Sequence, residues 1–338
     1  MTVQKLRIGI AGLGRMGKRH ALNLHTLTHR AEVVAVSSPD QNECKWAMDQ
    51  LDGVRVYRDY DEMLAKEDLQ TIVIASATAV HATQTLSAIE KGYHVLCEKP
   101  LSIDVAELSS AQSVVDAYKR SLRTHPNQKV MCAFSRRFDA SYREAYEKVV
   151  SGDYGRPVVF RSQTADLLDT SGVFVNYAKT SGGIFLDCSI HDIDLMLWFL
   201  EEKSKIKSLH AIGVTAVHPG LETINDRDNA IAIIEFYDGR IANLFCTRMM
   251  AAGQEDTTEI ICQKGAVRVN MQGQKNHVEV HDKLGSRQVR EFTECCLENT
   301  PLRVSLESSV RALAIGRALQ HSLVSGEKVI FDEICSRL

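Results

Sequence analysis

A glycine-rich stretch follows directly on the first apolar run of the chain. Residues 6–11 read LRIGIA and predict a buried strand, and residues 12–17 read GLGRMG. Glycines at this spacing allow a tight turn, a close approach of the backbone to a pyrophosphate, and tight packing of the next helix. The alternative is a glycine-rich turn that binds nothing. The preceding strand favours a dinucleotide-binding turn and hydride-transfer chemistry. The residues expected to hold the phosphates are Gly12, Leu13, Gly14, Arg15, Met16 and Gly17.

The size and charge of the chain limit what it can be. Its 338 residues are enough for two domains, each with its own core. Hydrophobic residues make up 44% and charged residues 25%, as in a soluble globular protein. The net charge of −3, from 40 basic and 43 acidic side chains, gives no reason to expect a nucleic acid or a membrane surface as partner.

The nine cysteines predict a location. No C-x-x-C pair and no zinc-binding spacing is present in the sequence. An odd number of cysteines scattered through apolar segments indicates reduced thiols that act as small buried hydrophobes. The N-terminus lacks the layout of a signal peptide, and no apolar run is long enough to span a bilayer. We therefore expect a cytoplasmic protein. The cysteines are Cys44, Cys97, Cys132, Cys188, Cys246, Cys262, Cys295, Cys296 and Cys335.

The first part of the chain alternates strand and helix patterns. Short β-branched or apolar runs separated by helical stretches, one of them at residues 103–123, indicate right-handed crossovers in a doubly wound parallel sheet. We expect an α/β chain with an N-terminal Rossmann domain at residues 1–125 that binds the dinucleotide. After the first strand, the runs expected to form strands are residues 31–36, 71–75, 93–97 and 130–134.

The second part has a different pattern of apolar runs. Its strand-like runs lie close together and predict an open, mostly antiparallel sheet with helices on one face. We expect residues 126–338 to form an α+β domain for substrate binding and oligomerisation. A second subunit would cover the other face of the sheet, because a broad exposed apolar face is a liability. The runs are residues 158–162, 229–237, 241–247, 259–262 and 266–270.

A lysine stands just after one of the parallel strands. Glu98, Lys99 and Pro100 follow the strand expected at residues 93–97. Ligands of open α/β sheets bind outside the carboxyl ends of the strands, so Lys99 is placed to donate to a substrate oxygen. Pro100 restricts Lys99 to extended geometry. The alternative is an ordinary surface lysine at the start of a loop.

The segment at residues 184–200 combines a polar and an apolar pattern. As one helix, it would place Asp187, His191 and Asp194 on one face, directed to a cleft. Its core face would carry Ile190, Ile193, Leu197 and Leu200. A carboxylate one turn before a histidine can accept its N–H and prepare it as a general base. A solvated helix face and a metal site are the alternatives; no further His or Cys pair nearby completes a metal shell, and we expect no metal.

These residues together indicate one reaction. His191 would take the proton of a secondary hydroxyl, Asp187 would steady the imidazolium, and Lys99 would hydrogen-bond the same oxygen. The hydride would pass to a nicotinamide ring.

The chain resembles the glucose–fructose oxidoreductase/inositol dehydrogenase/MocA family. The matching segments are GLGRMGKRHA near the start, HVLCEKPLS at 94–102, FSRRFD at 134–139 and GGIFLDCSIHDIDL at 182–195. The resemblance implies a Rossmann domain, a second domain with an open sheet, dimers or tetramers formed through that sheet, and a catalytic set of Lys99, Asp187 and His191. The segment around Asp187 and His191 is most similar to that of inositol 2-dehydrogenases.

One position departs from the family pattern. NAD-dependent members usually carry an acidic residue at the end of the second strand, where this chain has Ser38, followed by Pro39 and Asp40. Two alternatives stay open: Asp40 reaches back to the ribose, or the enzyme accepts NADP.

Further candidates are placed by position. Arg136 and Arg137 follow a strand end, where they contact a ligand or balance surface carboxylates. His81 is either near the nicotinamide ribose or a surface histidine that opens a helix. The further residues assigned to the cofactor are Ser37, Ser38, Ser76, His81, Glu98 and Arg137, and those assigned to the substrate beside the catalytic three are Asp166 and Tyr177.

We expect an NAD- or NADP-dependent dehydrogenase that oxidises a secondary hydroxyl of a cyclitol, a sugar or another polyol. It would act as a homodimer or homotetramer. Two alternatives are a non-redox glycosidase of the same family that recycles its NAD, and a catalytically silent dinucleotide-binding regulator. The regulator needs only the glycine turn, so the presence of Lys99, Asp187 and His191 speaks against it.

Overall fold

The computed structural model describes residues 4–102, 108–250, 254–271, 277–278 and 286–332. The start of the helix expected at residues 103–123 lies outside these residues, as does Cys335. The chain divides into two compact units. The first comprises residues 1–102, 109–138 and 282–307, and the second comprises residues 103–108, 139–281 and 308–338.

The first unit is built on a parallel sheet. Among the described residues this sheet has six strands in the order β3-β2-β1-β4-β5-β6, and every neighbouring pair is parallel. Strands β4, β5 and β6 are buried along almost their whole length, as expected for a sheet covered on both faces. The predicted doubly wound sheet is confirmed. The strands are β1 (Leu6–Ala11), β2 (Ala31–Ser37), β3 (Arg55–Tyr57), β4 (Thr71–Ile74), β5 (His94–Cys97) and β6 (Val130–Cys132).

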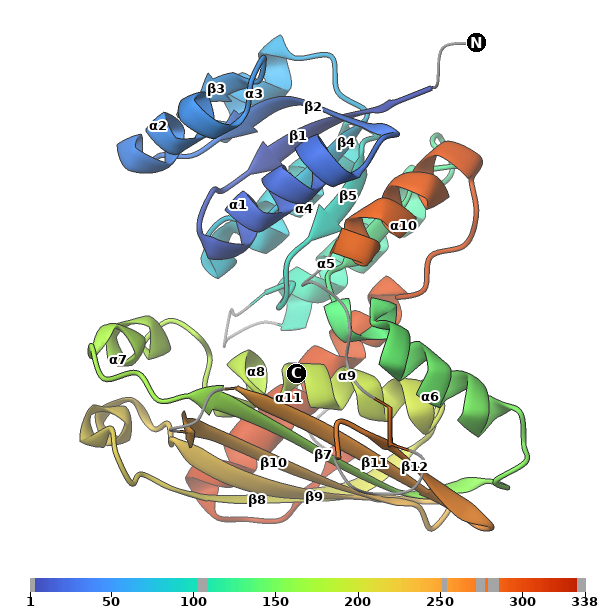
Figure 1. Cartoon of the computed structure of the whole chain (residues 1–338). Coiled ribbons are helices and arrows are strands. Elements are labelled where there is room, and N and C mark those ends of the chain that lie inside the picture. Colours follow the sequence, from blue (N-terminus) through green and yellow to red (C-terminus); the bar gives the residue numbers. More distant parts are fainter. Residues whose placement is uncertain (1–3, 103–107, 251–253, 272–276, 279–285, 333–338) are drawn as a thin grey trace. The chain divides into compact units, whose positions relative to one another are not determined.

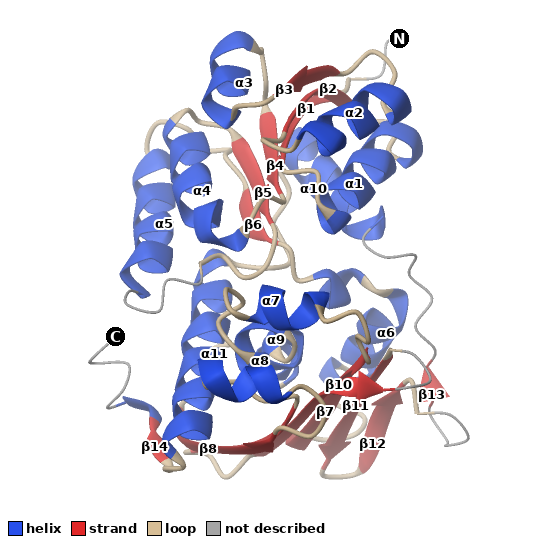
Figure 2. Ribbon diagram, turned by 90° about the vertical axis from the view of Figure 1, so that its left-hand side faces the viewer, coloured by secondary structure: helices blue, strands red, loops and turns tan. Residues whose placement is uncertain are grey.

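Helices cover both faces of this sheet (Figure 2). Helices α1 and α10 lie on one face, and α3, α4 and α5 lie on the other. The carboxyl ends of the strands lead into the turns and loops that carry most of the candidate site residues. The helices are α1 (Arg15–Leu22), α2 (Gln41–Gln50), α3 (Tyr60–Lys66), α4 (His81–Glu90), α5 (Leu108–Ser121) and α10 (Ser286–Glu298), with the short helices η1 (Asn23–Leu27), η2 (Thr78–Val80) and η3 (Ser135–Phe138).

The predicted boundary at residue 125 differs from this division in two ways. Strand β6 pairs with β5 and so lies in the first sheet, although it follows residue 125. Helix α10 also returns to the first unit, where it contacts β1 and η1. An ion pair between Glu298 and Arg30 reinforces this return. A sequence pattern shows that α10 is amphipathic, but not which sheet its apolar face will cover.

The second unit is built on a mixed sheet. In the described part of the chain it has eight strands in the order β13-β12-β11-β7-β10-β9-β8-β14. The β7–β10 and β12–β13 pairs are parallel and the other pairs are antiparallel. The predicted open, mostly antiparallel sheet is confirmed. The strands are β7 (Pro157–Leu167), β8 (Ile206–Val214), β9 (Asn229–Phe236), β10 (Ile241–Met250), β11 (Glu255–Cys262), β12 (Gly265–Val269), β13 (His277–Val278) and β14 (Val329–Ile330).

The described helices of the second unit gather on one face of this sheet (Figure 1). Along β9, buried and outward residues alternate, so one face of the strand packs against helices. Helix α9 packs against the core with four aliphatic side chains that are all fully buried. Burial of each one contributes about 1.5–3 kcal/mol to the free energy of folding. The helices are α6 (Ala140–Val150), α7 (Val173–Ala178), α8 (Ile184–Asp187), α9 (Ile190–Phe199) and α11 (Leu306–Ser325), with the short helix η4 (Pro219–Ile224).

The single helix predicted at residues 184–200 is wrong. The structure has two helices there, because the helical turn after Asp187 is wider than an α-helical turn. The amides of Cys188 and Ser189 both donate to the carbonyl oxygen of Ile184, at 3.1 Å each. This wider turn shifts the helix register, so Asp187 ends α8 and His191 lies in the first turn of α9.

The predicted polar stripe is also wrong at its far end. Asp194 is 1% exposed, so it does not face a cleft or solvent. The predicted core face is confirmed, since Ile190, Ile193, Leu197 and Leu200 are fully buried. No helix among the described residues combines the length and apolar character needed to cross a bilayer.

Candidate functional site

The glycine turn follows β1 as predicted. Gly12 has a φ of +85°, and a Cβ atom there would lie 2.3 Å from Ser76 Cα. A Cβ atom at Gly17 would lie 2.0 Å from the carbonyl oxygen of Gly12. Neither position can hold a side chain without moving backbone. The turn therefore packs tightly against β4 and against the first turn of α1.

The middle glycine faces open space. Gly14 precedes α1, and the nearest atom to a Cβ built on it is Glu43 Oε1, at 3.9 Å. The N–H groups of the first turn of α1, which have no partner within the helix, thus begin beside a residue that has no side chain. This arrangement fits the pyrophosphate of a dinucleotide, which the helix dipole also favours. Leu13 is buried, while Arg15 is exposed on the first turn of α1.

The end of β2 lies beside this turn. Ser37 accepts a hydrogen bond at its carbonyl oxygen from the Gly12 amide, at 2.8 Å. Ser38 is buried, and its hydroxyl donates to Glu43 Oε2 at 2.5 Å. The carboxylate of Asp40 accepts the amides of Asn42 and Glu43 at Oδ1 and caps α2, and its reach to the ribose stays a prediction.

The backbone around Lys99 is held from both sides. Glu98 Oε2 accepts the Lys99 amide at 3.2 Å, while its Oε1 lies 2.6 Å from Nε2 of the buried His20. Hydrogen bonding by His20 lowers the pKa of Glu98, although burial acts in the opposite direction and is the largest single contribution. The peptide bond from Lys99 to Pro100 is cis. Lys99 itself is partly exposed.

His81 holds the other side of this segment. Its Nδ1 lies 2.9 Å from the carbonyl oxygen of Pro100 and its Nε2 lies 3.1 Å from that of Ser76. Carbonyl oxygens only accept, so both nitrogens donate and the ring is an imidazolium. Burial lowers its pKa, but the Cys97 sulfur and the two carbonyls outweigh this and raise the pKa of His81 to about 9. The surface-histidine alternative is wrong, because His81 is 2% exposed.

Two further residues assigned to the cofactor have contacts of their own. The Ser76 hydroxyl donates to Gln84 Oε1 at 2.6 Å. Arg137 is buried, and its Nη1 donates to the carbonyl oxygen of Arg303 at 3.4 Å. Arg137 is therefore not a surface arginine, and its role toward the cofactor stays a prediction.

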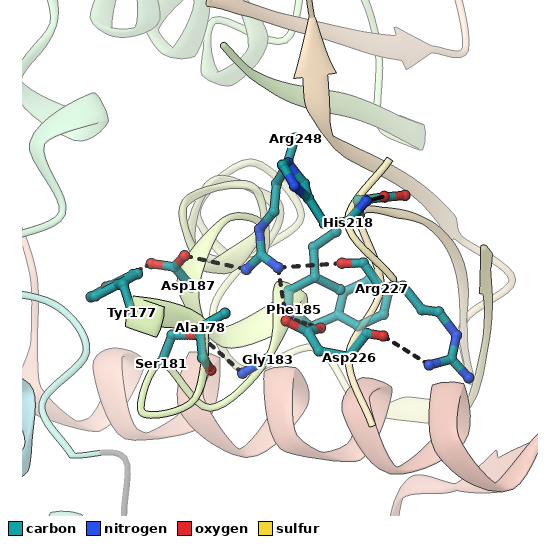
Figure 3. Close-up of polar contacts among 12 residues, drawn as sticks. Tyr177, Ala178, Ser181, Gly183, Phe185, Asp187, His218, Asp226, Arg227 and Arg248 are labelled. Carbon is teal, nitrogen blue, oxygen red and sulfur yellow. Dashed lines mark hydrogen bonds and ion pairs between the residues drawn. The ribbon is translucent and has the colours of Figure 1, made fainter. Parts of the chain in front are cut away.

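A buried ion pair organises the candidate site of the second unit (Figure 3). Arg248, near the end of β10, places its Nη1 2.8 Å from Asp226 Oδ2. Both side chains are 2% exposed. The other carboxylate oxygen of Asp226 accepts the amide of Ile184 at 2.9 Å, which fixes the start of α8. The guanidinium carbon also lies 4.5 Å from the centre of the Phe174 ring.

This pair positions Asp187. Arg248 Nη2 lies 3.2 Å from Asp187 Oδ2, and the Tyr177 hydroxyl donates to Asp187 Oδ1 at 3.0 Å. Figure 3 shows Asp187 between these two side chains. Tyr177 is 47% exposed, so its ring also faces solvent. The predicted pairing of Asp187 with His191 stays a prediction.

Asp166 brings a second carboxylate to the same region. Burial raises its pKa, and the charge of Asp187 raises it further. Two neighbouring carboxylates in different environments can play different parts, one as a fixed acceptor and one as a group that holds a proton.

The buried Asp192 anchors the first turn of α9, which carries His191. The buried Asp192 accepts the hydroxyls of Ser162 at 2.6 Å and Thr164 at 2.7 Å, both on β7. Ser189 donates to the same carboxylate at 3.2 Å. These bonds pin the first turn of α9, with the half-buried His191, onto the sheet.

Several of these residues were not predicted from the sequence. Arg248 carried one signal, a cation at the end of an apolar strand, because such a charge needs a buried partner. Glu43, His20, Asp192 and Asp226 carried no such signal. No group of three or more His, Cys, Asp or Glu side chains arranged for a metal was found in the part of the chain that the structure describes.

The protonated His81 predicts a pH-dependent stability. The pKa of His81 lies above the ordinary value of 6.5. Its contribution to the free energy of unfolding is therefore fully present below pH 6.5 and is lost as the pH rises through about 9. We expect the difference in unfolding free energy between wild type and His81→Gln to fall by up to about 1.4 kcal/mol per pH unit in this window. Urea unfolding across the window measures it.

His94 provides the matched control. Burial, with a smaller effect of Lys129, lowers its pKa to about 4, so it stays neutral across the same pH range. The difference between wild type and His94→Gln should therefore be constant there. A constant difference for His81→Gln as well would show that His81 is not an imidazolium.

The buried arginine predicts a large loss of stability. Arg248→Met leaves the carboxylate of Asp226 buried without its cation, so we expect the free energy of unfolding to fall by about 3–5 kcal/mol. The double variant Arg248→Met/Asp226→Asn should lose less than the sum of the single variants. Additive losses in urea unfolding would contradict the coupling of these two side chains.

Comparison with known proteins agrees with the geometry of both units. Residues 6–138 match the model of an oxidoreductase family with an NAD-binding Rossmann fold, and residues 142–268 match the GFO/IDH/MocA C-terminal domain. The scyllo-inositol 2-dehydrogenase (NAD(+)) of Bacillus subtilis is 27% identical over 97% of each chain. The inositol 2-dehydrogenase of Rubrobacter xylanophilus is 30% identical over 79% of this chain and 72% of its own.

A solved structure extends the match to the whole fold. The scyllo-inositol dehydrogenase from Lactobacillus casei, with bound NAD(H) and scyllo-inositol, matches with a TM-score of 0.85. It is 31% identical, and the match covers 97% of this chain and 100% of that chain. The chain therefore belongs to the GFO/IDH/MocA family and is an NAD(P)-dependent oxidoreductase that acts on CH–OH groups.

Proposed function

We propose that the protein oxidises a secondary hydroxyl of an inositol-like cyclitol. The observation that carries this proposal is the match, along nearly the whole chain, to an inositol dehydrogenase that holds NAD(H) and scyllo-inositol. The second unit supports it, because Asp166, Tyr177 and Asp187 gather acceptors and a hydroxyl that suit a ring bearing many hydroxyls.

Lys99, Asp187 and His191 are the proposed catalytic residues. The ammonium of Lys99 donates to the reacting oxygen, and His191 accepts its proton. Asp187, held by Arg248 and Tyr177, stabilises the positive charge that His191 gains. Bound NAD(P) supplies the hydride acceptor. The same proposal assigns Asp166 and Tyr177 to substrate hydroxyls.

The proposed cofactor residues surround the glycine turn and the neighbouring strand ends. The open surface at Gly14 and the free amides of α1 support the phosphate site. Beyond residues 12–17, the proposed residues are Ser37, Ser38, Ser76, His81, Glu98 and Arg137.

A substrate panel tests the function. We expect reduced nicotinamide to accumulate with an inositol isomer, and more slowly with aldoses or linear polyols. Lys99→Met and His191→Asn should each lower kcat by about 10²–10⁴ while dinucleotide binding persists. Lys66→Met is the matched control, since Lys66 is an exposed lysine of the same unit that pairs with Glu62.

The other outcomes separate the rival functions. Glycoside cleavage without net reduced nicotinamide would indicate the non-redox glycosidase. Dinucleotide binding with no turnover of any substrate would indicate the regulator. Near-normal turnover by either variant would remove that residue from the catalytic set.

We also infer a homodimer or homotetramer formed through the sheet of the second unit, and a cytoplasmic location. Five aliphatic side chains on the outer face of β8, β9 and β10 are 42–61% exposed, and Ile212 lies directly opposite Ile231. Such a patch marks an interaction surface. The aliphatic residues are Ile212, Val214, Ile231, Ile233 and Ile241.

The cysteines support the inferred cytoplasmic location. The eight described cysteines are free thiols, which suits a reducing compartment.

Light scattering after gel filtration tests the assembly. We expect the wild type to be a dimer or tetramer and Ile231→Lys/Ile233→Lys to be monomeric, because charges would be buried without partners. Leu27→Lys is the control, since Leu27 is 58% exposed but lies in the first unit. A monomeric wild type would contradict the inference.

A further inference from the structure

The end of β2 presents a problem for recognition of the cofactor. In Rossmann folds, a carboxylate at this place hydrogen-bonds the ribose 2′-hydroxyl of NAD, whereas a nearby arginine accommodates the 2′-phosphate of NADP. Here the strand ends in Ser37 and continues into Ser38, and neither has a charge. Asp40 is occupied at the start of α2.

Glu43 brings a carboxylate back to this place from the first turn of α2. Its Oε2 accepts the Ser38 hydroxyl at 2.5 Å and the Leu13 amide at 3.3 Å. Its Oε1 lies 3.9 Å from the Cβ position of Gly14. One side chain thus joins the end of β2 to the glycine turn.

The contacts also explain why a serine suits position 38. Its short side chain leaves room for a carboxylate from α2, and its hydroxyl orients that carboxylate by donating to it. The amide of Asp40 in turn donates to Ser38 Oγ, at 3.2 Å. The segment from β2 to α2 therefore holds the carboxylate of Glu43 in one orientation.

We propose that Glu43 is the residue that reads the adenosine ribose and makes the enzyme prefer NAD to NADP. Oε1 is not used in the contacts to Ser38 and Leu13, which leaves it to accept a ribose hydroxyl. A 2′-phosphate at the same place meets a fixed negative charge. The proposal rests on dinucleotide binding by the family, and it deepens the proposed function by choosing the cofactor.

One cation acts against this preference. Arg58 is exposed, and its Nη2 donates to the carbonyl oxygen of Pro39 at 2.9 Å. It lies next to the same segment and can attract a phosphate. The balance between Glu43 and Arg58 decides the preference, and Glu43 is the one that touches both the glycine turn and Ser38.

Equilibrium binding measures this balance without turnover. Titration calorimetry with NADH and NADPH should give the wild type a preference for NADH of about tenfold or more. In Glu43→Gln this ratio should fall about tenfold, with weaker NADH binding and stronger NADPH binding, because the repulsion disappears and one acceptor is lost. Thermal unfolding of each variant shows that it is folded.

Asp40→Asn is the matched control. It removes the same charge three residues away, but Asp40 is directed to the helix amides, so the ratio should stay as in the wild type. A wild-type ratio at or below one overturns the proposal, even if Glu43→Gln fails to fold. An unchanged ratio in folded Glu43→Gln overturns it too. If the wild type binds neither NADH nor NADPH, this result would instead contradict the proposed function.

Discussion

The contact between Gly17 and the carbonyl oxygen of Gly12 determines where the first helix can begin. A Cβ atom at residue 17 would lie 2.0 Å from that oxygen, so only glycine lets α1 start so close to the end of β1. The free amides of α1 consequently stand at the carboxyl edge of the sheet, and the Leu13 amide reaches Glu43. The proposed phosphate site and the proposed recognition of the ribose by Glu43 both depend on this packing contact, which involves no charge.

Around Lys99, charged side chains fix the backbone. Glu98 accepts the Lys99 amide, and the imidazolium of His81 donates to the next carbonyl, that of Pro100. Both are buried, so each bond is made in a region of low dielectric constant, where it is strong. The lysine side chain therefore leaves a backbone that is fixed on both sides, which is what a positioned donor requires.

The sequence predicted what local patterns determine. The strand, turn and helix at residues 6–22 form because apolar alternation and glycine spacing act over a few residues. The break after Asp187 was not predicted, because no residue pattern marks the wider turn in which the amides of Cys188 and Ser189 share the carbonyl oxygen of Ile184. The return of α10 to the first sheet and the bond from the Leu13 amide to Glu43 depend on tertiary packing between distant segments. Lys99, Asp187 and His191 were proposed from their motifs, whereas the ion pair of Arg248 with Asp187 is known only from the structure.

The second unit fixes Asp187, the proposed catalytic carboxylate, by charge instead of close packing. The guanidinium of Arg248 carries one positive charge and pairs with both Asp226 and Asp187, and Asp166 lies in the same region. The guanidinium lies within 3.2 Å of Asp226 and Asp187, while burial and the charge of Asp187 raise the pKa of Asp166. In the proposed substrate site, these two carboxyl groups therefore differ: Asp187 is held as an acceptor by a guanidinium, whereas Asp166 takes up a proton more readily.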